Sequence, residues 1–312
     1  MYFIILIVFI SLFTSLSFSS KLKPIFGILS LPEPLNDTKR YINESIDINY
    51  IKWLEAAGAE IVPIHVWYSE KELVELLSQI NGVLLQGSFM KLNFSNVWEK
   101  KAKFLFNFSL ENKLPIFGIC MGFRMLNVMM SGNESLITKI RNHGNHHVEF
   151  TKEMKNSTLF SLFTDKDRHF FETEDSTVYI QRHGITDEMF KNEEKLVKEF
   201  KLTSYSYDLD GVKFINSIEN DNYHIYGTQF HPEKTPFIRV KRYNRTFTYN
   251  ALRRSQLLSM KIVDIARKYT PLKLVKNITE FKQKYDGFLH KLKNKLFDKD
   301  ITIIYLFKNK FN

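Results

Sequence analysis

Residues 114–126, "LPIFGICMGFRML", decide the fold class, because a short apolar run leads through a cysteine into a helical pattern. Gly118 and Gly122 stand two residues before and two residues after Cys120. A strand that turns sharply into a helix needs glycine where side chains would collide, and it presents its central side chain at the carboxyl edge of the sheet. We therefore predict a nucleophile elbow centred on Cys120. The structural alternative is a buried cysteine in a glycine-rich turn.

The first half of the chain alternates between short apolar runs and amphipathic segments. Ser69 precedes one of these segments and is followed by acidic residues, which is the pattern of a helix start. Alternation of this kind predicts an α/β fold with three layers, α/β/α, around a mostly parallel central sheet. The expected strands are 23–30, 61–66, 82–87 and 114–119, and the expected helices are 48–57, 69–80, 98–113 and the residues after 122.

The second half is less regular. We interpret its strand-like pieces as a continuation of the same sheet with antiparallel additions; they are 146–150, 177–181, 211–218 and 223–230. Residues 250–269 form an amphipathic helical pattern. Beyond Pro271 the chain is rich in lysine, and 281–297 has the pattern of a solvated basic helix, which we prefer to attachment at a membrane surface. The predicted organisation is one domain over 20–270 and a basic C-terminal extension over 271–312.

Residues 1–19 are expected to be a signal peptide. They contain no charged side chain and end in small residues that match a cleavage site. A retained membrane anchor is the alternative, but Ser and Thr shorten the strongly apolar part. The chain also contains eight Asn-x-Ser/Thr sequons, at Asn36, Asn43, Asn93, Asn107, Asn133, Asn156, Asn244 and Asn277. We therefore expect a glycoprotein that is secreted or delivered to a lysosome or vacuole.

The formal net charge of +10 favours encounters with anionic partners. The basic residues are scattered and no nucleic-acid-binding module is visible, so no nucleic-acid partner and no stable membrane partner are expected. Cys120 is the only cysteine, so it has no partner for an internal disulfide. In a secreted protein such a cysteine is buried and inert, pairs with another chain, or is a reactive thiol.

A thiol nucleophile needs a base, and His231 in "YGTQFHPEK" follows an apolar strand pattern. Glu233 stands two residues later, which places it on the same side as His231 if the segment is extended, where it can orient the imidazole. The order Cys, His, acid also places the three residues at carboxyl ends of strands, where open α/β sheets bind ligands. The sequence therefore predicts Cys120, His231 and Glu233 as nucleophile, base and orienting acid.

Other histidines carry weaker signals. His143, His146 and His147 lie close together, but no carboxylate or cysteine accompanies them at ligand spacing, so we interpret them as an exposed loop. We expect no metal site and no cofactor. His183 follows a strand-like run and could face the same cleft as Cys120.

The motifs "EAAGAEIVPI", "INGVLLQGS", "FGICMGF" and "YGTQFHPEK", in this order, resemble the class I glutamine amidotransferase-like superfamily, and within it the γ-glutamyl hydrolases. The resemblance extends from about residue 23 to about residue 269. It implies the flavodoxin-like arrangement of that superfamily and a thiol-dependent hydrolase, an omega peptidase that cleaves γ-glutamyl bonds of folylpoly-γ-glutamates. It also implies an oxyanion hole formed by Gly87 and Met121 and a substrate-binding role for His183. A homodimer is left open.

The chain departs from the family pattern at three places. Gln86, Gly87 and Ser88 replace two adjacent glycines, Ser45 falls about where a substrate-contacting tyrosine is expected, and Arg124 replaces an acidic continuation after the elbow. The alternatives to the hydrolase are a glutaminase that supplies ammonia to a synthase and a binding protein with an inactive relic of the site. The leader disfavours the glutaminase, and retention of all three catalytic residues disfavours the relic.

Overall fold

The computed structural model describes residues 23–32, 43–237, 248–285, 289–297 and 300–308. The expected signal peptide therefore lies outside the described residues, as do the sequons at Asn36 and Asn244. None of the helices in the described ranges is both long enough and apolar enough to cross a membrane.

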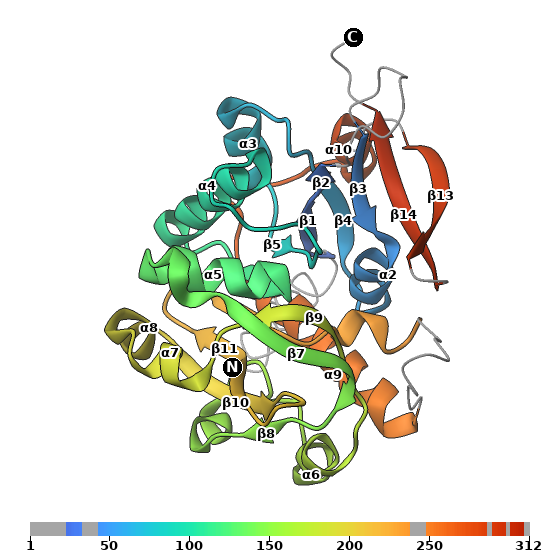
Figure 1. The fold of residues 1–312 in the computed structure, drawn as a ribbon. Coiled ribbons are helices and arrows are strands. Elements are labelled where there is room, and N and C mark those ends of the chain that lie inside the picture. The colour runs from blue at the N-terminus through green and yellow to red at the C-terminus, as the bar shows by residue number, and fades with distance from the viewer. Residues whose placement is uncertain (1–22, 33–42, 238–247, 286–288, 298–299, 309–312) are drawn as a thin grey trace, which may run out of the picture.

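An eight-stranded sheet forms the centre of the molecule, with the strand order β4-β1-β5-β6-β12-β11-β10-β8 (Figure 1). Within the run from β4 to β12, adjacent strands are parallel to one another, whereas β11, β10 and β8 extend the sheet from β12 through antiparallel pairs. The strand bounds are β1 Ile25–Leu29, β4 Glu60–Ile64, β5 Gly82–Leu85, β6 Ile116–Ile119, β8 Glu149–Phe150, β10 Lys201–Tyr207, β11 Lys213–Asn220 and β12 Ile225–Thr228. The predicted mostly parallel sheet with antiparallel additions is confirmed.

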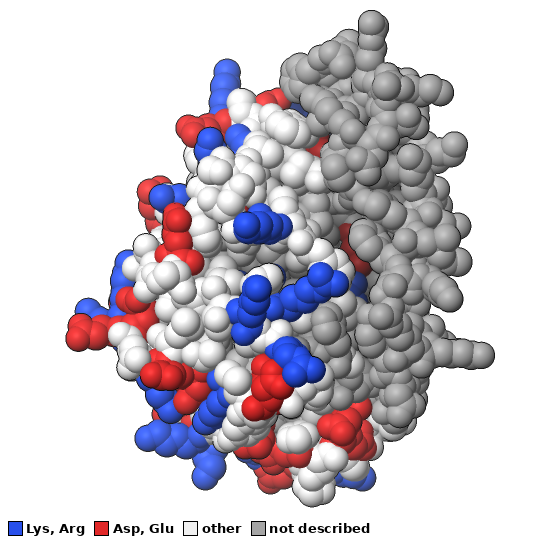
Figure 2. Space-filling view, in the orientation of Figure 1, with Lys and Arg blue, Asp and Glu red and all other residues white. Residues whose placement is uncertain are grey.

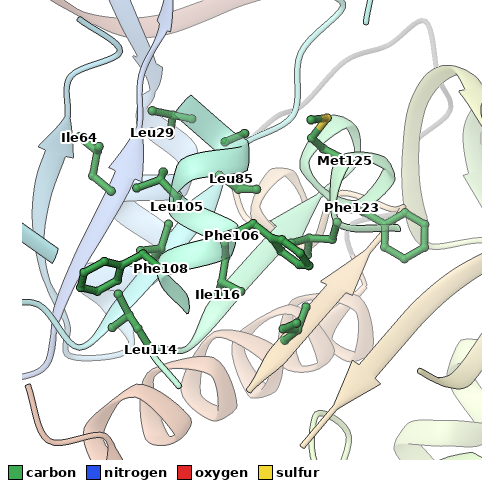
Figure 3. Packing of buried hydrophobic residues seen from close by; sticks show 14 of the residues in the cluster. Leu29, Ile64, Leu85, Leu105, Phe106, Phe108, Leu114, Ile116, Phe123 and Met125 are labelled. Carbon is green, nitrogen blue, oxygen red and sulfur yellow. The ribbon is translucent and has the colours of Figure 1, made fainter. Parts of the chain in front are cut away.

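Helices cover both faces of this sheet. In β1, Ile25 and Leu29 belong to one apolar cluster and Phe26 and Ile28 to a second, because alternate side chains point to opposite faces. The first cluster includes side chains of α3, α4 and α5, and part of it is drawn in Figure 3; the second includes side chains of α2 and α9. The predicted three-layer architecture is therefore confirmed. The helix bounds are α2 Ile48–Ala56, α3 Glu70–Leu77, α4 Val97–Asn112, α5 Met121–Ser131, α6 Asp165–Thr173, α7 Asp187–Lys191, α8 Glu194–Glu199, α9 Tyr249–Lys268 and α10 Ile278–Tyr285, with 3-10 turns η1 Glu134–Leu136, η2 Lys152–Asn156 and η3 Pro232–Lys234.

Several local predictions are confirmed. Ser69 caps α3 through a reciprocal capping box with Glu72, as the acidic first turn indicated. Helix α2 ends one residue before Ala57, close to the expected stop at Gly58, whose φ of +93° suits glycine.

Other predictions are wrong. Residues 177–181 do not join the main sheet: β9 (Thr177–Gly184) pairs with β7 (Thr138–His146) in a separate two-stranded ribbon. The histidines expected in a loop therefore lie in β7 or directly after it. The basic helix expected over 281–297 is divided between α10 and β13 (Leu289–Phe297). β13 pairs with β14 (Asp300–Lys308), which continues to β3 (Asn43–Asp47) and β2 (Leu31–Pro32).

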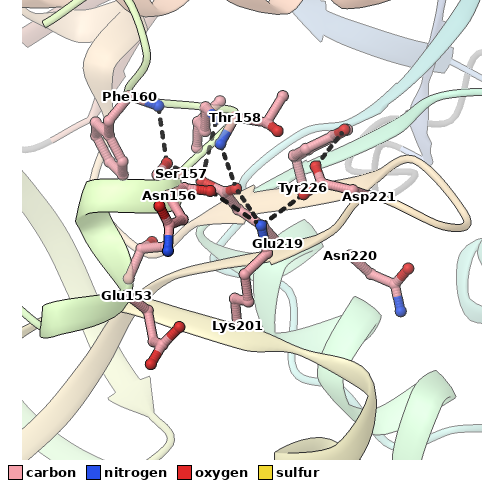
Figure 4. Close-up of polar contacts among 12 residues, drawn as sticks. Glu153, Asn156, Ser157, Thr158, Phe160, Lys201, Glu219, Asn220, Asp221 and Tyr226 are labelled. Atoms are coloured by element: carbon pink, nitrogen blue, oxygen red, sulfur yellow. Dashed lines mark hydrogen bonds and ion pairs between the residues drawn. The ribbon is translucent and has the colours of Figure 1, made fainter.

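A buried carboxylate ties the antiparallel part of the sheet to the loop after η2 (Figure 4). Glu219 of β11 is fully buried and accepts hydrogen bonds from Ser157 Oγ and from the backbone N–H groups of Thr158 and Leu159. Burial raises the pKa of Glu219, and these hydrogen bonds together with Lys201 Nζ at 3.8 Å oppose that shift. These hydrogen bonds add to the one that Lys201 Nζ donates to the carbonyl oxygen of Asn156, and together they hold the loop against the sheet.

Candidate active site

Cys120 stands between β6 and α5 in a strained backbone conformation. Its φ of +55° and ψ of −100° lie outside the regions that non-glycine residues usually occupy. The flanking glycines allow the turn: a methyl group on Gly118 would lie 2.6 Å from the backbone of Gly122, and one on Gly122 would lie 2.1 Å from the carbonyl oxygen of Leu85. The strand, tight turn and helix expected for a nucleophile elbow are therefore present.

His231 follows β12, the strand next to β6, and its backbone N–H donates to Val178 O of β9 at 2.9 Å. Its Nδ1 lies 2.8 Å from Glu233 Oε1, and both side chains are almost completely buried. The segment is not extended as expected from the sequence: Glu233 reaches the imidazole from η3, a 3-10 turn that begins at Pro232. The carboxylate fixes Nδ1 as the protonated nitrogen and leaves Nε2 for the thiol side of the ring.

The ionisation of Cys120 and His231 is linked. Burial alone lowers the pKa of His231, but the charges of Glu233 and Cys120 outweigh burial and raise it to about 9. Burial alone raises the pKa of the Cys120 thiol, but the imidazolium of His231 and the guanidinium of Arg124 hold it below its ordinary value. These opposite shifts favour a thiolate paired with an imidazolium, which is the reactive form of a cysteine nucleophile.

Gly87 follows β5, the strand on the other side of β6, and lies directly against the pair. A methyl group at Gly87 would lie 2.9 Å from His231 Cε1, 3.1 Å from Cys120 Cβ and 2.9 Å from Tyr50 Oη. Its backbone N–H donates to Tyr50 Oη at 2.9 Å. The N–H of Met121, the other predicted oxyanion donor, belongs to the first turn of α5, where backbone N–H groups have no partner within the helix.

Arg124 lies one helical turn after Cys120, and its side chain is 6% exposed. Its Nε lies 3.5 Å from the carbonyl oxygen of Cys120, and its charge contributes to the lowered pKa of the thiol. Within the described ranges no carboxylate forms an ion pair with this guanidinium. Arg124, which stands where an acidic residue was expected after the elbow, is therefore a buried cation beside the nucleophile.

Further cations surround His183, which is half-buried in β9. Burial lowers its pKa, and the charges of Arg124, Lys139, Arg182 and Lys91 lower it further. Lys139 stands directly opposite His183 in the β7–β9 ribbon, and Figure 2 shows Lys and Arg side chains gathered over the middle of this face. Lys91, Lys139 and Arg182 are exposed, and none of them forms an ion pair with a carboxylate of the described residues. We call these three residues the basic cluster.

An ion pair next to Glu233 joins Asp47, the last residue of β3 and the N-cap of α2, to Lys234 of η3. Lys234 Nζ lies 2.8 Å from Asp47 Oδ2 and 3.7 Å from Glu233 Oε1. Although burial opposes it, the charges of Asp47 and Glu233 raise the pKa of Lys234. Lys234 therefore stays charged and helps to keep Glu233 ionised, since its charge contributes to the lowered pKa of that carboxyl.

The structure brings together Cys120, His231, Glu233, Gly87 and Met121, while His183 lies near enough to Arg124 for its pKa to respond. Tyr50 and Lys234 are site residues that the sequence did not predict; in the sequence, Tyr50 is one position of an amphipathic helix. The spacing of Arg124, four residues after Cys120 in a helix, could have placed it on the face of the nucleophile.

Among the described residues there is no group of three or more His, Cys, Asp or Glu that could hold a metal ion. His147 lies 3.3 Å from Asp175 and 3.9 Å from Glu149, in exposed ion-pair geometry.

Comparison with known proteins gives three results. The family model described as glutamine amidotransferase class-I matches residues 43–251. The chain is 31% identical to mouse gamma-glutamyl hydrolase over 251 residues, which cover 79% of this chain and 78% of that protein. It is also 31% identical to human gamma-glutamyl hydrolase over 220 residues, covering 69% of each.

One solved structure supports the fold. The glutaminase domain of Trypanosoma brucei CTPS, solved with bound acivicin, matches with a TM-score of 0.52 and 14% sequence identity, covering 81% of this chain and 98% of that domain. At this identity the similarity shows the architecture alone.

Proposed function

Because this chain belongs to the γ-glutamyl hydrolases within the class I glutamine amidotransferase family, we propose that it cleaves γ-glutamyl amide bonds of folylpoly-γ-glutamates with Cys120, His231 and Glu233 as its catalytic residues. The observation that carries the proposal is the thiol of Cys120, on a strained backbone, beside an imidazole that is held by a buried carboxylate. These groups supply a nucleophile, an acid–base and an orienting acid.

In the first half of the reaction, Cys120 Sγ attacks the γ-carbonyl carbon, and the new C–S bond moves an electron pair onto the carbonyl oxygen. When this oxyanion collapses, the C–N bond breaks and the proton of the His231 imidazolium passes to the leaving nitrogen. The products are an amine and a thioester on Cys120. Neutral His231 remains, still hydrogen-bonded to Glu233.

In the second half, His231 takes a proton from water as the water oxygen attacks the thioester carbon. Collapse of this second oxyanion breaks the C–S bond and releases the γ-carboxyl group. Cys120 leaves as a thiolate and His231 is again an imidazolium, so the starting ion pair is restored.

The charge around the site supports a substrate rich in carboxylates. A poly-γ-glutamate chain carries one α-carboxylate on each residue, and the basic cluster offers three exposed cations that have no carboxylate partner among the described residues. Long-range attraction of this kind raises association rates and is weakened by salt. We therefore expect KM for long chains to depend on ionic strength more strongly than KM for a diglutamate.

The first test is chromatography of a pteroyl-γ-glutamate oligomer after incubation with the protein or with Cys120→Ala. Shortening that requires Cys120 supports the proposal, and the product ladder gives the cut site. Hydrolysis of free glutamine without shortening of the oligomer would instead favour a glutaminase. The absence of both activities would favour a binding protein.

The basic cluster has its own test. Lys139→Gln with Arg182→Gln should raise KM for long oligomers and reduce its dependence on salt. Arg141→Gln is the matched control, because Arg141 is exposed, lies in the same ribbon and is paired with Asp210 at 2.7 Å. An effect of Arg141→Gln about half as large as that of the double change would show that only net charge matters.

We further propose that the protein enters the secretory pathway. The apolar residues 1–19 and the sequons support this, and the side chains of Asn156 and Asn277 are exposed. A shift in electrophoretic mobility after enzymatic removal of N-glycans would be expected, and an unprocessed N-terminus without glycans would contradict it.

A further inference from the structure

The backbone N–H of Gly87, the expected oxyanion donor, is already hydrogen-bonded. Its acceptor is the hydroxyl oxygen of Tyr50, at 2.9 Å. A carbonyl oxygen that used this N–H directly would have to displace the hydroxyl. The arrangement raises the question of which group donates to the oxyanion.

Tyr50 comes from α2, and its side chain is only 1% exposed. The hydroxyl of Tyr50 lies beside the reacting groups. A methyl group built on Gly87 would contact Tyr50 Oη, Cys120 Cβ and His231 Cε1 at the same time. The ring of Tyr50 is also held by neighbouring elements, with Lys234 Nζ 5.9 Å from the ring centroid. The buried hydroxyl therefore lies beside both reacting residues, Cys120 and His231.

The hydrogen-bonding capacity of this hydroxyl is only partly used. A tyrosine hydroxyl donates one hydrogen bond and accepts others. Tyr50 Oη accepts from Gly87, and no described residue accepts a hydrogen bond from it. A buried O–H without an acceptor is costly unless a ligand supplies one.

The surroundings keep this group protonated. Burial raises the pKa of Tyr50 well above its ordinary value, and the nearby charges of Glu233, Asp47 and Cys120 raise it further. The protonated hydroxyl is therefore the favoured form, and it can donate a hydrogen bond. Donation from Gly87 N–H to its oxygen also polarises the O–H bond, since chained hydrogen bonds strengthen one another.

We propose that the Tyr50 hydroxyl, together with the N–H of Met121, donates to the oxyanion formed during attack by Cys120, and that Gly87 acts through Tyr50. The inference rests on the proposed acyl-transfer chemistry. Under this proposal α2 supplies the oxyanion donor that was expected from Gly87, in the loop after β5.

The experiment compares Tyr50→Phe with the wild type on a pteroyl-γ-glutamate oligomer and on free glutamine, because attack on either amide forms the same type of oxyanion. We expect kcat to fall by about 10²-fold with little change in KM, as for loss of one oxyanion donor. The matched control is Tyr226→Phe, whose buried hydroxyl bonds to Asp221 at 3.1 Å from within β12. Circular dichroism and thermal unfolding establish that both variants are folded.

A second measurement separates donation from a structural role. Fluorinated tyrosine at position 50 keeps the ring and the acceptor oxygen but makes the O–H a stronger donor, so kcat should shift upward relative to Tyr50→Phe and to the wild type. A purely structural contact would not respond to the acidity of the phenol.

The outcomes are distinct. If Tyr50→Phe keeps or increases kcat, Gly87 N–H is the direct donor and the inference is wrong. If the wild type hydrolyses glutamine but not the oligomer, the proposed function is wrong while the glutamine data still decide the role of Tyr50. If neither amide is hydrolysed, both proposals fail.

Discussion

Glu233→Gln removes the charge that keeps His231 protonated and replaces it with a side chain of nearly equal size. In the wild type, the carboxylate lies 2.8 Å from Nδ1 and is fully buried. The pKa of His231, about 9 against an ordinary 6.5, corresponds to about 3 kcal/mol in favour of the imidazolium. Glu233 is the largest of the charges that raise this pKa, so we expect the pKa of His231 to fall in the variant, although the charge of Cys120 still opposes burial.

The sign of the pH effect follows from the charged form of each group. The imidazolium exists below the pKa of His231, so the wild type should keep its ion pair up to about pH 9 and the variant should lose it at a lower pH. The pKa of Cys120 should rise at the same time, since the imidazolium is the first of the charges that lower it. The pH range in which Cys120 is a thiolate and His231 an imidazolium therefore narrows at its acid and its alkaline end. We expect kcat/KM near neutral pH to fall by about 10²-fold.

Two measurements check this prediction: kcat/KM as a function of pH, and the rate of alkylation of Cys120 by iodoacetamide over the same range. Cys120 is the only cysteine, so the alkylation signal has a single source. Glu174→Gln is the control, because Glu174 also bonds to other side chains, Asn250 and Arg254, and should leave both profiles in place. An alkaline limb that stays near pH 9 in Glu233→Gln would refute the reasoning.

Three further predictions follow from other contacts. Gly87→Ala should reduce kcat/KM by at least about 10²-fold, measured as hydrolysis, because the added methyl would crowd His231 and the thiol. Asp167→Asn should lower the free energy of unfolding by about 1–2 kcal/mol at pH 6. The pKa of Asp167 is about 2, because its hydrogen bonds to Arg253 and Thr164 outweigh burial. The difference in stability between the variant and the wild type should therefore disappear as the pH falls from about 4 towards 2. Glu219→Gln should gain stability relative to the wild type as the pH rises above about 4, because burial raises the pKa of Glu219 in the folded state and the wild type then loses stability through that pKa.

Denaturant titrations at several pH values measure the last two effects as differences from the wild type, so other titrating groups cancel. A pH-independent difference in either variant would contradict the assigned pKa shift. For Gly87→Ala, Gly211→Ala is a comparison at a position where an added methyl meets nothing within 4 Å, although its φ of +76° also disfavours alanine. Equal loss of activity in both would show that the effect is not local.

The sequence predicted the elbow well because its constraint is local. Gly118 and Gly122 are needed where the turn brings backbone against backbone, and this requirement is visible in the spacing alone. The layer order was also predictable, since the alternation of strand and helix patterns in the first half leaves few topologies.

The remaining errors concern contacts distant in sequence. Strand β9 has the pattern of a sheet strand but pairs with β7, because pattern gives strand identity and not partner choice. Tyr50 precedes Gly87 by 37 residues, and no local signal marks its hydroxyl as part of the site. The His–Pro–Glu segment gave the correct acid for an incorrect geometric reason, since a 3-10 turn brings Glu233 to the ring.

The position of β6 and β12 inside the sheet has a consequence for the lifetime of the active state. Cys120 and His231 follow two strands that are hydrogen-bonded to each other and to further strands on their outer sides. Fraying of sheet edges and local opening of surface loops leave such interior pairs intact, because these pairs exchange only on cooperative unfolding. Catalytic activity should therefore be lost in the same cooperative transition in which the central sheet unfolds. No partly folded species should remain active.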